Sequence, residues 1–355
     1  MPFEMVVIVL LVIAIALAVV ALFYARSVGR RIASAPDGPE PAAEASDAVE
    51  LPQGAHRIAV ILNPSKNKAA SAKRRLVEAC ASAGLEPPVF FETTPDDAGY
   101  QMTRDALEGD FDTIIAAGGD GTVRVAVEVM TGHDKVMSVL PLGTGNLLAR
   151  NLDIDVDDDE EALSQAVFGT ERKVDSARVR LTRADGTVEE KVFAVIAGVG
   201  FDAEMMEATD SELKARLGAV AYAEAGFRQM AGHRKTVRIT IDDAEEMVVK
   251  TRSVMVANCG KLQGGLVLAP DAVIDDGLLD VVVMSPRSVF GWGWIALRGM
   301  LKHRSKKDPI IDYYQGRRVT LRVDEAIAAQ LDGDTDGEVV RMDVEVLPGA
   351  LEVRC

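Results

Sequence analysis

One loop in the first half of the chain combines glycines, an acid and a hydroxyl at the end of an apolar run. Gly118-Gly119-Asp120-Gly121-Thr122 follows the run Thr113–Ala117 and precedes a helix-like stretch. Glycines let a backbone approach an anion closely, and N–H groups at a helix N-terminus bind phosphate. Asp120 is suited to act on a magnesium ion, directly or through water. A tight structural turn is the alternative, because glycine-rich turns are common.

Two further loops favour the phosphate interpretation. Asn63-Pro64-Ser65-Lys66-Asn67 follows the first strand-like run, and Pro141-Leu142-Gly143-Thr144-Gly145-Asn146 follows the fourth. Carboxyl ends of parallel strands meet at one edge of a sheet, where α/β proteins bind nucleotides. Lys66 is the natural cation for a phosphate, with a solvent-facing lysine as the alternative. The chain has neither a Walker-type loop nor a GxGxxG fingerprint, which argues against a P-loop NTPase and an ordinary dinucleotide fold.

These loops require a sheet to hold them, and the apolar pattern predicts one. Continuous apolar strands that alternate with helices indicate a parallel sheet covered on both faces, which we expect over residues 56–170. The expected strands are residues 57–63, 88–94, 111–117 and 135–143, and the expected helices are residues 69–84, 96–109, 122–130 and 146–152.

The pattern changes beyond about residue 170. Strand-like runs with short connections predict a mostly antiparallel β-rich domain over residues 171–345, and the first two form a hairpin across an Asp-Gly turn. These runs are residues 177–183, 187–198, 235–241, 247–258, 278–284, 317–323 and 340–347. A helical insert is expected at Ser211–Met230, and residues 346–355 can add a strand to the α/β domain. A cleft between two such domains is a common place for a ligand.

Composition excludes several classes of function. The 55 Asp and Glu residues outnumber the 39 Lys and Arg residues, which argues against a nucleic-acid partner. Three scattered cysteines and four separated histidines predict neither a disulfide framework nor a zinc site, and they suit a reducing compartment. The acidic run 153–167 lacks glycine and glutamate where a calcium-binding EF-hand loop needs them, so it is better interpreted as a helix N-terminus.

The N-terminal segment predicts a membrane anchor. Met5–Tyr24 contains no charged residue, and a helix needs about 20 apolar residues to cross a bilayer. Arg26, Arg30 and Arg31 follow it, so the positive-inside rule leaves the catalytic body in the cytoplasm. We therefore expect a single-pass cell-membrane protein with its transmembrane anchor in residues 1–32 and a flexible linker in residues 33–55. A buried core helix is the alternative for the apolar segment.

A set of short motifs from Arg57 onward resembles one protein family. The matching stretches, in the family's order, are NPSKN, GGDGT, PLGTGNLLARNL, GVGFDAE, LKARLGAVAYAEAG, DDGLLDVVV, LDGD and VLPGALEV. The chain resembles the bacterial lipid kinases built on the diacylglycerol-kinase catalytic domain, which are related to sphingosine kinases and more remotely to NAD kinases. The resemblance implies an α/β nucleotide-binding domain followed by a β-rich lipid-substrate domain.

The resemblance also implies an ATP site at the glycine loops. Two departures change the charge near it: Arg124-Val125 stand where the family often has Asn-Glu, and Leu147-Leu148 replace an Asp-Phe pair. The implied ATP-lining residues are Asn63, Pro64, Ser65, Lys66, Asn67, Thr93, Gly119, Asp120, Gly121, Thr122, Val123, Arg124, Val125 and Thr144.

The same resemblance implies a magnesium site and a catalytic element. The magnesium ligands would be the carbonyls of Val273 and Leu278 with the side chain of Asp276, and a β-turn is the alternative for this stretch. Asp332 and Asp334 of LDGD would position the acceptor hydroxyl and take its proton, acting with Asp120. TDGE at residues 335–338 repeats the pattern, so the catalytic acids can instead belong to that repeat.

A basic segment with tryptophans, residues 290–307, allows two interpretations. It can dock at an anionic bilayer, or it can be a helix packed on the β domain. We expect an ATP- and Mg²⁺-dependent kinase that converts diacylglycerol to phosphatidic acid, and a homodimer is compatible with the sequence. The alternatives are a kinase of sphingoid bases or other hydroxyl lipids, an NAD kinase, and a membrane-anchored protein that binds nucleotide or lipid without catalysis.

Overall fold

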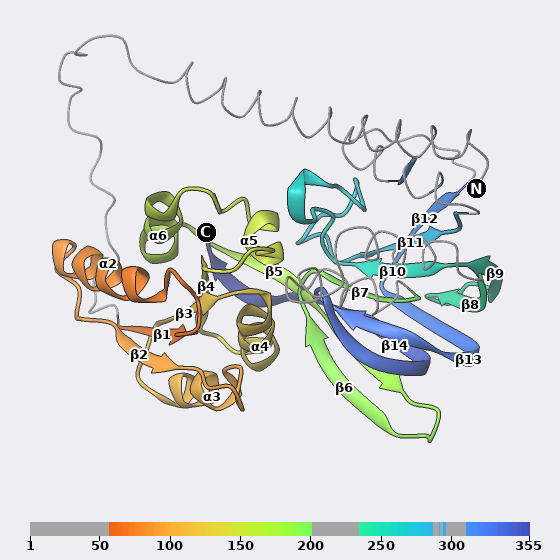
Figure 1. Ribbon diagram of the computed structural model, residues 1–355, viewed down its shortest axis with the longest axis horizontal. Coiled ribbons are helices and arrows are strands. Elements are labelled where there is room, and N and C mark those ends of the chain that lie inside the picture. The colour runs from red at the N-terminus through yellow and green to blue at the C-terminus, as the bar shows by residue number, and fades with distance from the viewer. Residues whose placement is uncertain (1–56, 201–233, 287–290, 292–293, 296–309) are drawn as a thin grey trace, which may run out of the picture. The chain divides into compact units, whose positions relative to one another are not determined.

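The structure, a computed structural model, describes residues 57–200, 234–286, 291, 294–295 and 310–355 (Figure 1). All of them belong to one compact unit, Pro52–Cys355. The predicted span Met5–Tyr24, the helical insert Ser211–Met230 and most of the segment 290–307 lie outside the described residues. Within the described ranges, no helix is both long and apolar enough to cross a bilayer.

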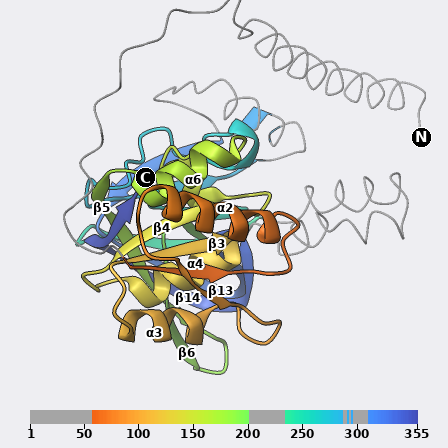
Figure 2. The same cartoon turned by 90° about the vertical axis from the view of Figure 1, so that its left-hand side faces the viewer.

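The first half is an α/β layer structure, as the alternating pattern predicts. Strands β1, β3 and β4 consist almost entirely of buried residues, and they pair in parallel with each other, while β2 adds a parallel edge strand. Helices α2 and α6 cover one face of this sheet, and α3 and α4 cover the other (Figures 1 and 2). The bounds are β1 Ile58–Leu62, α2 Ala69–Ser82, β2 Val89–Glu92, α3 Tyr100–Glu108, β3 Thr113–Gly118, α4 Asp120–Met130, β4 Val136–Pro141, α5 Leu147–Asn151 and α6 Asp159–Phe168.

Local sequence explains where two of these helices form. In α2 the buried residues Ala69, Ala72, Leu76 and Cys80 recur every three or four positions, which places them on one face of the helix. The acidic run begins α6: the Asp158 carboxylate accepts the backbone N–H groups of Glu160 and Glu161. A capping carboxylate and acids in the first turn stabilise a helix N-terminus, so the helix interpretation of this run is confirmed.

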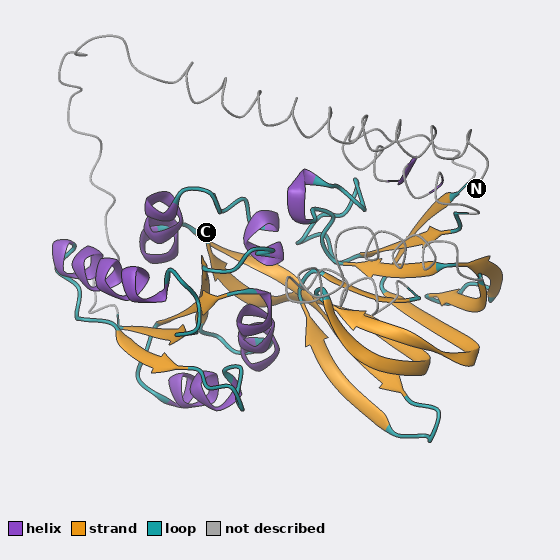
Figure 3. Cartoon of the chain, in the orientation of Figure 1, coloured by secondary structure: helices purple, strands orange, loops and turns teal. Residues whose placement is uncertain are grey.

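The second half is mostly antiparallel β structure, also as predicted (Figure 3). Its first hairpin, β5–β6, turns through Asp185 and Gly186, and Gly186 has a φ of 86°. The pattern did not predict β12. The bounds are β5 Glu171–Thr182, β6 Val188–Phe193, β7 Ile196–Val199, β8 Lys235–Ile241, β9 Met247–Thr251, β10 Ser253–Ala257, the short 3-10 helix η1 Gln263–Gly265, β11 Leu279–Met284, β12 Ile311–Gly316, β13 Arg318–Leu331 and β14 Asp334–Arg354.

One strand joins the two halves into a continuous 14-stranded sheet. The first part of β14 pairs with β13, and its last residues, Glu352–Arg354, pair in parallel with β4. Strand β14 also pairs with β5 along most of its length. The turn between β13 and β14 is residues Asp332 and Gly333, so this sheet fixes the position of the LDGD stretch relative to the glycine loops.

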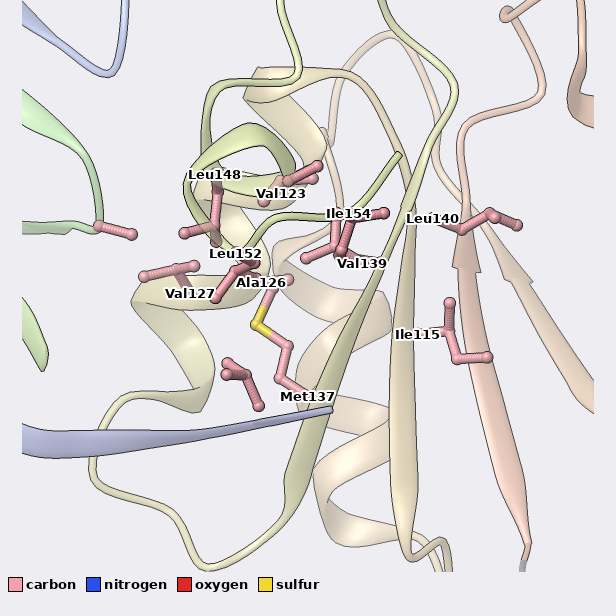
Figure 4. Packing of buried hydrophobic residues seen from close by; sticks show 14 of the residues in the cluster. Ile115, Val123, Ala126, Val127, Met137, Val139, Leu140, Leu148, Leu152 and Ile154 are labelled. Carbon is pink, nitrogen blue, oxygen red and sulfur yellow. The ribbon is translucent and has the colours of Figure 1, made fainter. Parts of the chain in front are cut away.

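The hydrophobic core holds the two helices that follow the glycine loops. Val123, Ala126 and Val127 of α4 pack among buried residues that include Met137 of β4 and Leu148 of α5 (Figure 4). A second buried cluster fills the β half, with Phe193 as its largest fully buried side chain. Because α4 and α5 are fixed by the core, the loops at their N-terminal ends are fixed as well.

Candidate active site

The loops after β3 and β4 touch each other through glycines. A Cβ atom placed on Gly143 would lie 2.7 Å from the Cα of Gly119, and one placed on Gly145 would collide with the Asp120 carboxylate. The backbone N–H of Leu142 donates to the carbonyl of Gly118 at 2.8 Å. The glycines of both motifs are therefore required by close packing of the loops as well as suited to an anion.

Asp120 connects the same two loops. Its carboxylate accepts the backbone N–H groups of Asn146 at 3.0 Å and Leu147 at 2.6 Å. Asn146 has a φ of 49° and closes its own loop through two hydrogen bonds with Gly143. Asp120 thus holds the start of α5, which the spacing of the motifs did not predict. Its action on magnesium stays a prediction.

The loop after β1 joins this cluster. The Asn63 side chain accepts the N–H and hydroxyl of Ser65 and donates to the Thr122 hydroxyl at 3.4 Å. The Lys66 amine lies next to the loop after β3: it is 3.4 Å from the position that a Cβ atom on Gly119 would take. No acidic side chain in the described part of the chain forms an ion pair with Lys66. Its charge is therefore available to an anion at the glycine loops.

The remaining predicted ATP-lining residues divide into two groups. Pro64, Ser65, Asn67 and Thr144 are exposed, whereas Thr93 is buried. The side chains of Val123 and Val125 are 7% and 0% exposed and belong to the core. Their side chains therefore do not line an open site, and the predicted role of these two residues in binding ATP would depend on their backbone groups.

Asp332 and Asp334 have opposite environments although one glycine separates them. Asp332 is buried, with a φ of 48°, and its carboxylate accepts the backbone N–H groups of Ala194, Val195 and Ile196 at 2.8–3.2 Å. Burial raises the pKa of Asp332 to about 6, although these N–H groups and Arg124 oppose the rise. Asp332 therefore holds the turn.

Asp334 is the open acid of the turn. Its side chain is 56% exposed, and its carboxylate lies 3.6 Å from the Nε of Arg124. A Cβ placed on Gly121 would lie 3.8 Å from the same carboxylate. The structure therefore brings the predicted catalytic Asp334 to the first turn of α4, next to the predicted ATP-site residues Gly121 and Arg124.

The acids of TDGE face the β5–β6 hairpin instead. Asp336 binds Arg183 at 2.9 Å and Lys191 at 2.7 Å, and its side chain is 13% exposed. Burial alone would raise the pKa of Asp336, but Lys191 and Arg183 hold it below its usual value. Glu338 is exposed, and its carbonyl accepts a hydrogen bond from Arg183. The structure therefore favours LDGD over TDGE as the element near the glycine loops.

The predicted magnesium loop is held by an acid that the sequence did not single out. Buried Asp175 accepts the N–H groups of Gly277 and Gly349, both at 2.7 Å. Asp175 precedes the strand-like run at residues 177–183, and no motif in the sequence marked it. Asp276 accepts the N–H of Leu278 at 3.0 Å, and Val273 is exposed at the start of the loop.

The chemistry of this loop suits a cation. Burial raises the pKa of Asp276, and the neighbouring carboxylates of Asp175 and Asp275 raise it further. Such a negative environment favours a bound positive ion. No group of three His, Cys, Asp or Glu side chains among the described residues could hold a metal, so a cation here would depend on backbone carbonyls. The predicted set of Val273, Asp276 and Leu278 meets that requirement.

A cavity of about 780 Å³ lies beside this loop rather than at the glycine loops. Its lining includes Arg150, Lys261, Leu266 and Val273. No residue of GGDGT or LDGD lines it. The contacts between the glycine loops and LDGD therefore lie outside this cavity.

Comparisons with known proteins match both halves of the chain to known families. The family described as "Diacylglycerol kinase catalytic domain" matches residues 57–179, and the family described as "YegS C-terminal NAD kinase beta sandwich-like domain" matches residues 194–355. The diacylglycerol kinase of Bacillus subtilis (strain 168) is 28% identical over 285 residues, which cover 79% of this chain and 90% of that protein.

Two further relatives extend the comparison. The protein of Pseudomonas aeruginosa (strain UCBPP-PA14) named "Probable lipid kinase YegS-like" is 31% identical, over 79% of this chain and 88% of that protein. A solved structure from Bacillus anthracis str. Sterne has a TM-score of 0.68 at 21% identity, covering 84% of this chain and 96% of that chain, which supports the fold alone. With both halves matched in order, the chain belongs to the family of bacterial diacylglycerol kinases and YegS-like lipid kinases.

Proposed function

We propose that the protein is an ATP-dependent lipid kinase that phosphorylates diacylglycerol to phosphatidic acid. The observation that carries the proposal is the approach of an exposed carboxylate, Asp334, to the N-terminal turn of α4 and its glycine loop. Phosphoryl transfer needs one carboxylate near the attacking hydroxyl and donors around the phosphates. Membership of the lipid kinase family supports a lipid as the acceptor.

The nucleotide phosphates would bind at the three joined loops. The N-terminal end of α4 offers backbone N–H groups and the positive end of a helix dipole, and Lys66 adds a full charge. A bound Mg²⁺ would supply positive charge that neutralises the phosphate oxygens, and the Asp120 carboxylate would hold the ion or its waters. Asp120 would do so while its oxygens keep the start of α5 in place.

Asp334 would act as the proton acceptor. The lipid hydroxyl oxygen attacks the γ-phosphorus, and the bond between that phosphorus and the bridging oxygen to the β-phosphate breaks. ADP leaves, and the hydroxyl proton passes to the Asp334 carboxylate. Asp332 holds the turn that presents Asp334 and does not receive this proton, because its oxygens already accept three N–H groups. A second Mg²⁺ at Val273, Asp276 and Leu278 would stabilise the β half.

The N-terminal sequence supports a proposal for the localisation of the enzyme. We propose that residues 1–32 anchor it in the cell membrane, that residues 33–55 form a linker, and that the body faces the cytoplasm. Residues 56–170, with the strand 346–355, would then bind ATP, and residues 171–345 would bind the lipid. The pairing of Glu352–Arg354 with β4 supports this assignment of the last strand.

A transfer assay tests the proposal. Full-length protein in vesicles that contain diacylglycerol is given ATP labelled at the γ-phosphate, with and without Mg²⁺. We expect labelled phosphatidic acid only with Mg²⁺, and at least about 100-fold less of it from a matched Asp334→Asn preparation. Parallel vesicles with a sphingoid base, and NAD in solution, serve as competing acceptors. Label on either of these but not on diacylglycerol would replace the proposed substrate, and label on none of them would overturn the kinase function.

A further inference from the structure

The open acid of the turn has one ionic partner among the described residues. Asp334 begins β14 in the β half, and Arg124 lies in the first turns of α4 in the α/β half. An aspartate that is 56% exposed on a tight turn is free to rotate unless something holds it. The distance of 3.6 Å between Nε and the carboxylate is too long for a hydrogen bond, so the contact is ionic.

Arg124 is itself held from the other side. Its Nη1 lies 3.9 Å from the carboxylate of Glu128, one helical turn later, and the Tyr100 hydroxyl of α3 donates to that carboxylate at 2.8 Å. The Arg124 side chain is only 18% exposed, and its Nε has no hydrogen-bond partner among the described residues. The guanidinium is therefore fixed on α4 and keeps a free donor that can close on Asp334.

We propose that Arg124 is a positioning residue that holds the Asp334 carboxylate at the N-terminal end of α4. This inference rests on the proposed function, since Asp334 must be the proton acceptor for its position to matter. One hydrogen bond and two ionic contacts link Tyr100, Glu128, Arg124 and Asp334 from α3 through α4 to β14, and so connect the acid of the β half to the nucleotide loop. Arg124 also lowers the pKa of Asp332, which burial raises, so its charge acts on both acids of the turn.

The alternative is that Arg124 binds a nucleotide phosphate directly. A phosphate ligand contributes to binding ATP, so its loss raises the KM for ATP. A residue that only orients the proton acceptor affects the chemical step, so its loss lowers kcat and leaves that KM unchanged. The two roles therefore predict different kinetic changes for the same substitution.

The test uses the full-length enzyme in diacylglycerol vesicles and compares Arg124→Gln with a matched control, Arg104→Gln. The Arg104 guanidinium lies 5.9 Å from the ring centre of Tyr100, one turn earlier on the same helix α3, and none of its described contacts is with LDGD. We expect Arg124→Gln to lower kcat about 10-fold with the KM for ATP within about twofold, as contacting residues are coupled by such amounts. Arg104→Gln should change neither value by more than about twofold.

A double-mutant cycle supplies the decisive readout. In an Asp334→Asn background, adding Arg124→Gln should change the residual kcat by less than about twofold, because the group that Arg124 positions has lost its charge. An equal loss in both backgrounds would show that Arg124 acts independently of Asp334, and a raised KM for ATP with unchanged kcat would make it a phosphate ligand; either result overturns the inference. If the wild-type enzyme labels no acceptor, the proposed function itself fails, and the inference fails with it.

Discussion

The two Asp-Gly repeats, LDGD at residues 331–334 and TDGE at residues 335–338, are almost alike in sequence and differ in what surrounds them. In the first, one acid is buried against three N–H groups and the other is open beside Arg124. In the second, Asp336 is bound by two cations and Glu338 is exposed. A carboxylate is available for proton transfer only when hydrogen bonds do not already occupy both of its oxygens. By this criterion Asp334 is available, and Asp332 and Asp336 are not.

The position of each repeat in the sheet explains the difference. LDGD spans the turn between β13 and β14, next to the start of β7, and Asp332 accepts N–H groups from Ile196 of β7 and from the two residues before it. TDGE lies two residues into β14, where the β5–β6 hairpin supplies Arg183 and Lys191. The two repeats are four residues apart on one hairpin. The first therefore lies at the nucleotide loop, and the second lies in a structural ion cluster.

The largest expected effect is a loss of kcat on substitution of Asp334, the exposed acid of the first repeat. Asp334→Asn should lower kcat by about 10²–10⁴-fold with little change in the KM for ATP, because a lost proton acceptor affects mainly the chemical step. The matched variant Glu338→Gln in the second repeat should keep kcat within about twofold. Steady-state kinetics with saturating diacylglycerol measures both. A dead Glu338→Gln beside an active Asp334→Asn would assign the proton acceptor to TDGE.

The second prediction concerns Asp120 of the α/β half. Like Asp332, Asp120 accepts backbone N–H groups through its carboxylate. If Asp120 also holds the magnesium of the nucleotide, Asp120→Asn should lower kcat by about 100-fold. The amide keeps one oxygen acceptor for the start of α5, so the fold should survive. Kinetics with circular dichroism checks this. Near-normal kcat would leave Asp120 with only its structural role.

The third prediction concerns the ion cluster of the second repeat. Asp336→Ala removes the acid that binds Arg183 and Lys191, and leaves these partly buried cations without it. We expect the free energy of unfolding to fall by about 1–3 kcal/mol, while kcat stays within about twofold. Urea denaturation and kinetics on the same preparation measure the two quantities. A large loss of kcat without a loss of stability would contradict the structural role of TDGE.

The last prediction is a pH dependence of the free energy of unfolding, caused by Asp332 of the first repeat. Asp332 has a pKa of about 6 in the folded protein, above its ordinary value of 3.8. The folded state therefore holds this proton more tightly than the unfolded state, and the stability that Asp332 contributes falls as pH rises from about 4 to about 6. Relative to Asp332→Asn, the wild-type protein should lose about 2 kcal/mol across this window, because the shift from 3.8 to about 6 is about two pKa units. Denaturation at a series of pH values tests this, and a constant difference would contradict it.

Sequence pattern was sufficient for features that depend on local order. The alternation of apolar strands and helices predicted β1 to β4, and the spacing of glycines predicted loops at one sheet edge. The same pattern missed β12, and it did not show that β13 continues to Leu331. The residues that extend β13, VDEAIAAQL, include several that favour strands weakly, so their pairing is decided by distant partners.

Distant partners also decide which acids are structural and which is open, so the sequence did not predict these roles. Asp175 binds Gly277 and Gly349, which lie 102 and 174 residues further along the chain, and Asp332 binds N–H groups more than 130 residues before it. Val125 was expected at the ATP site, but the orientation of α4 turns its side chain into the core. Such long-range contacts follow from topology, which local periodicity does not contain.

The pairing of β14 with β4 has a consequence for how the protein is made. The Ser138 hydroxyl of β4 donates to the Arg354 carbonyl of β14, and 216 residues separate the two. During synthesis one edge of β4 pairs with β3, and the other edge therefore has no partner until the β half has been translated. Exposed edges invite pairing with other chains, and contacts of such long range form slowly. We expect the nascent α/β half to need protection by chaperones, and a chain cut short before β14 to lack a completed nucleotide-binding sheet.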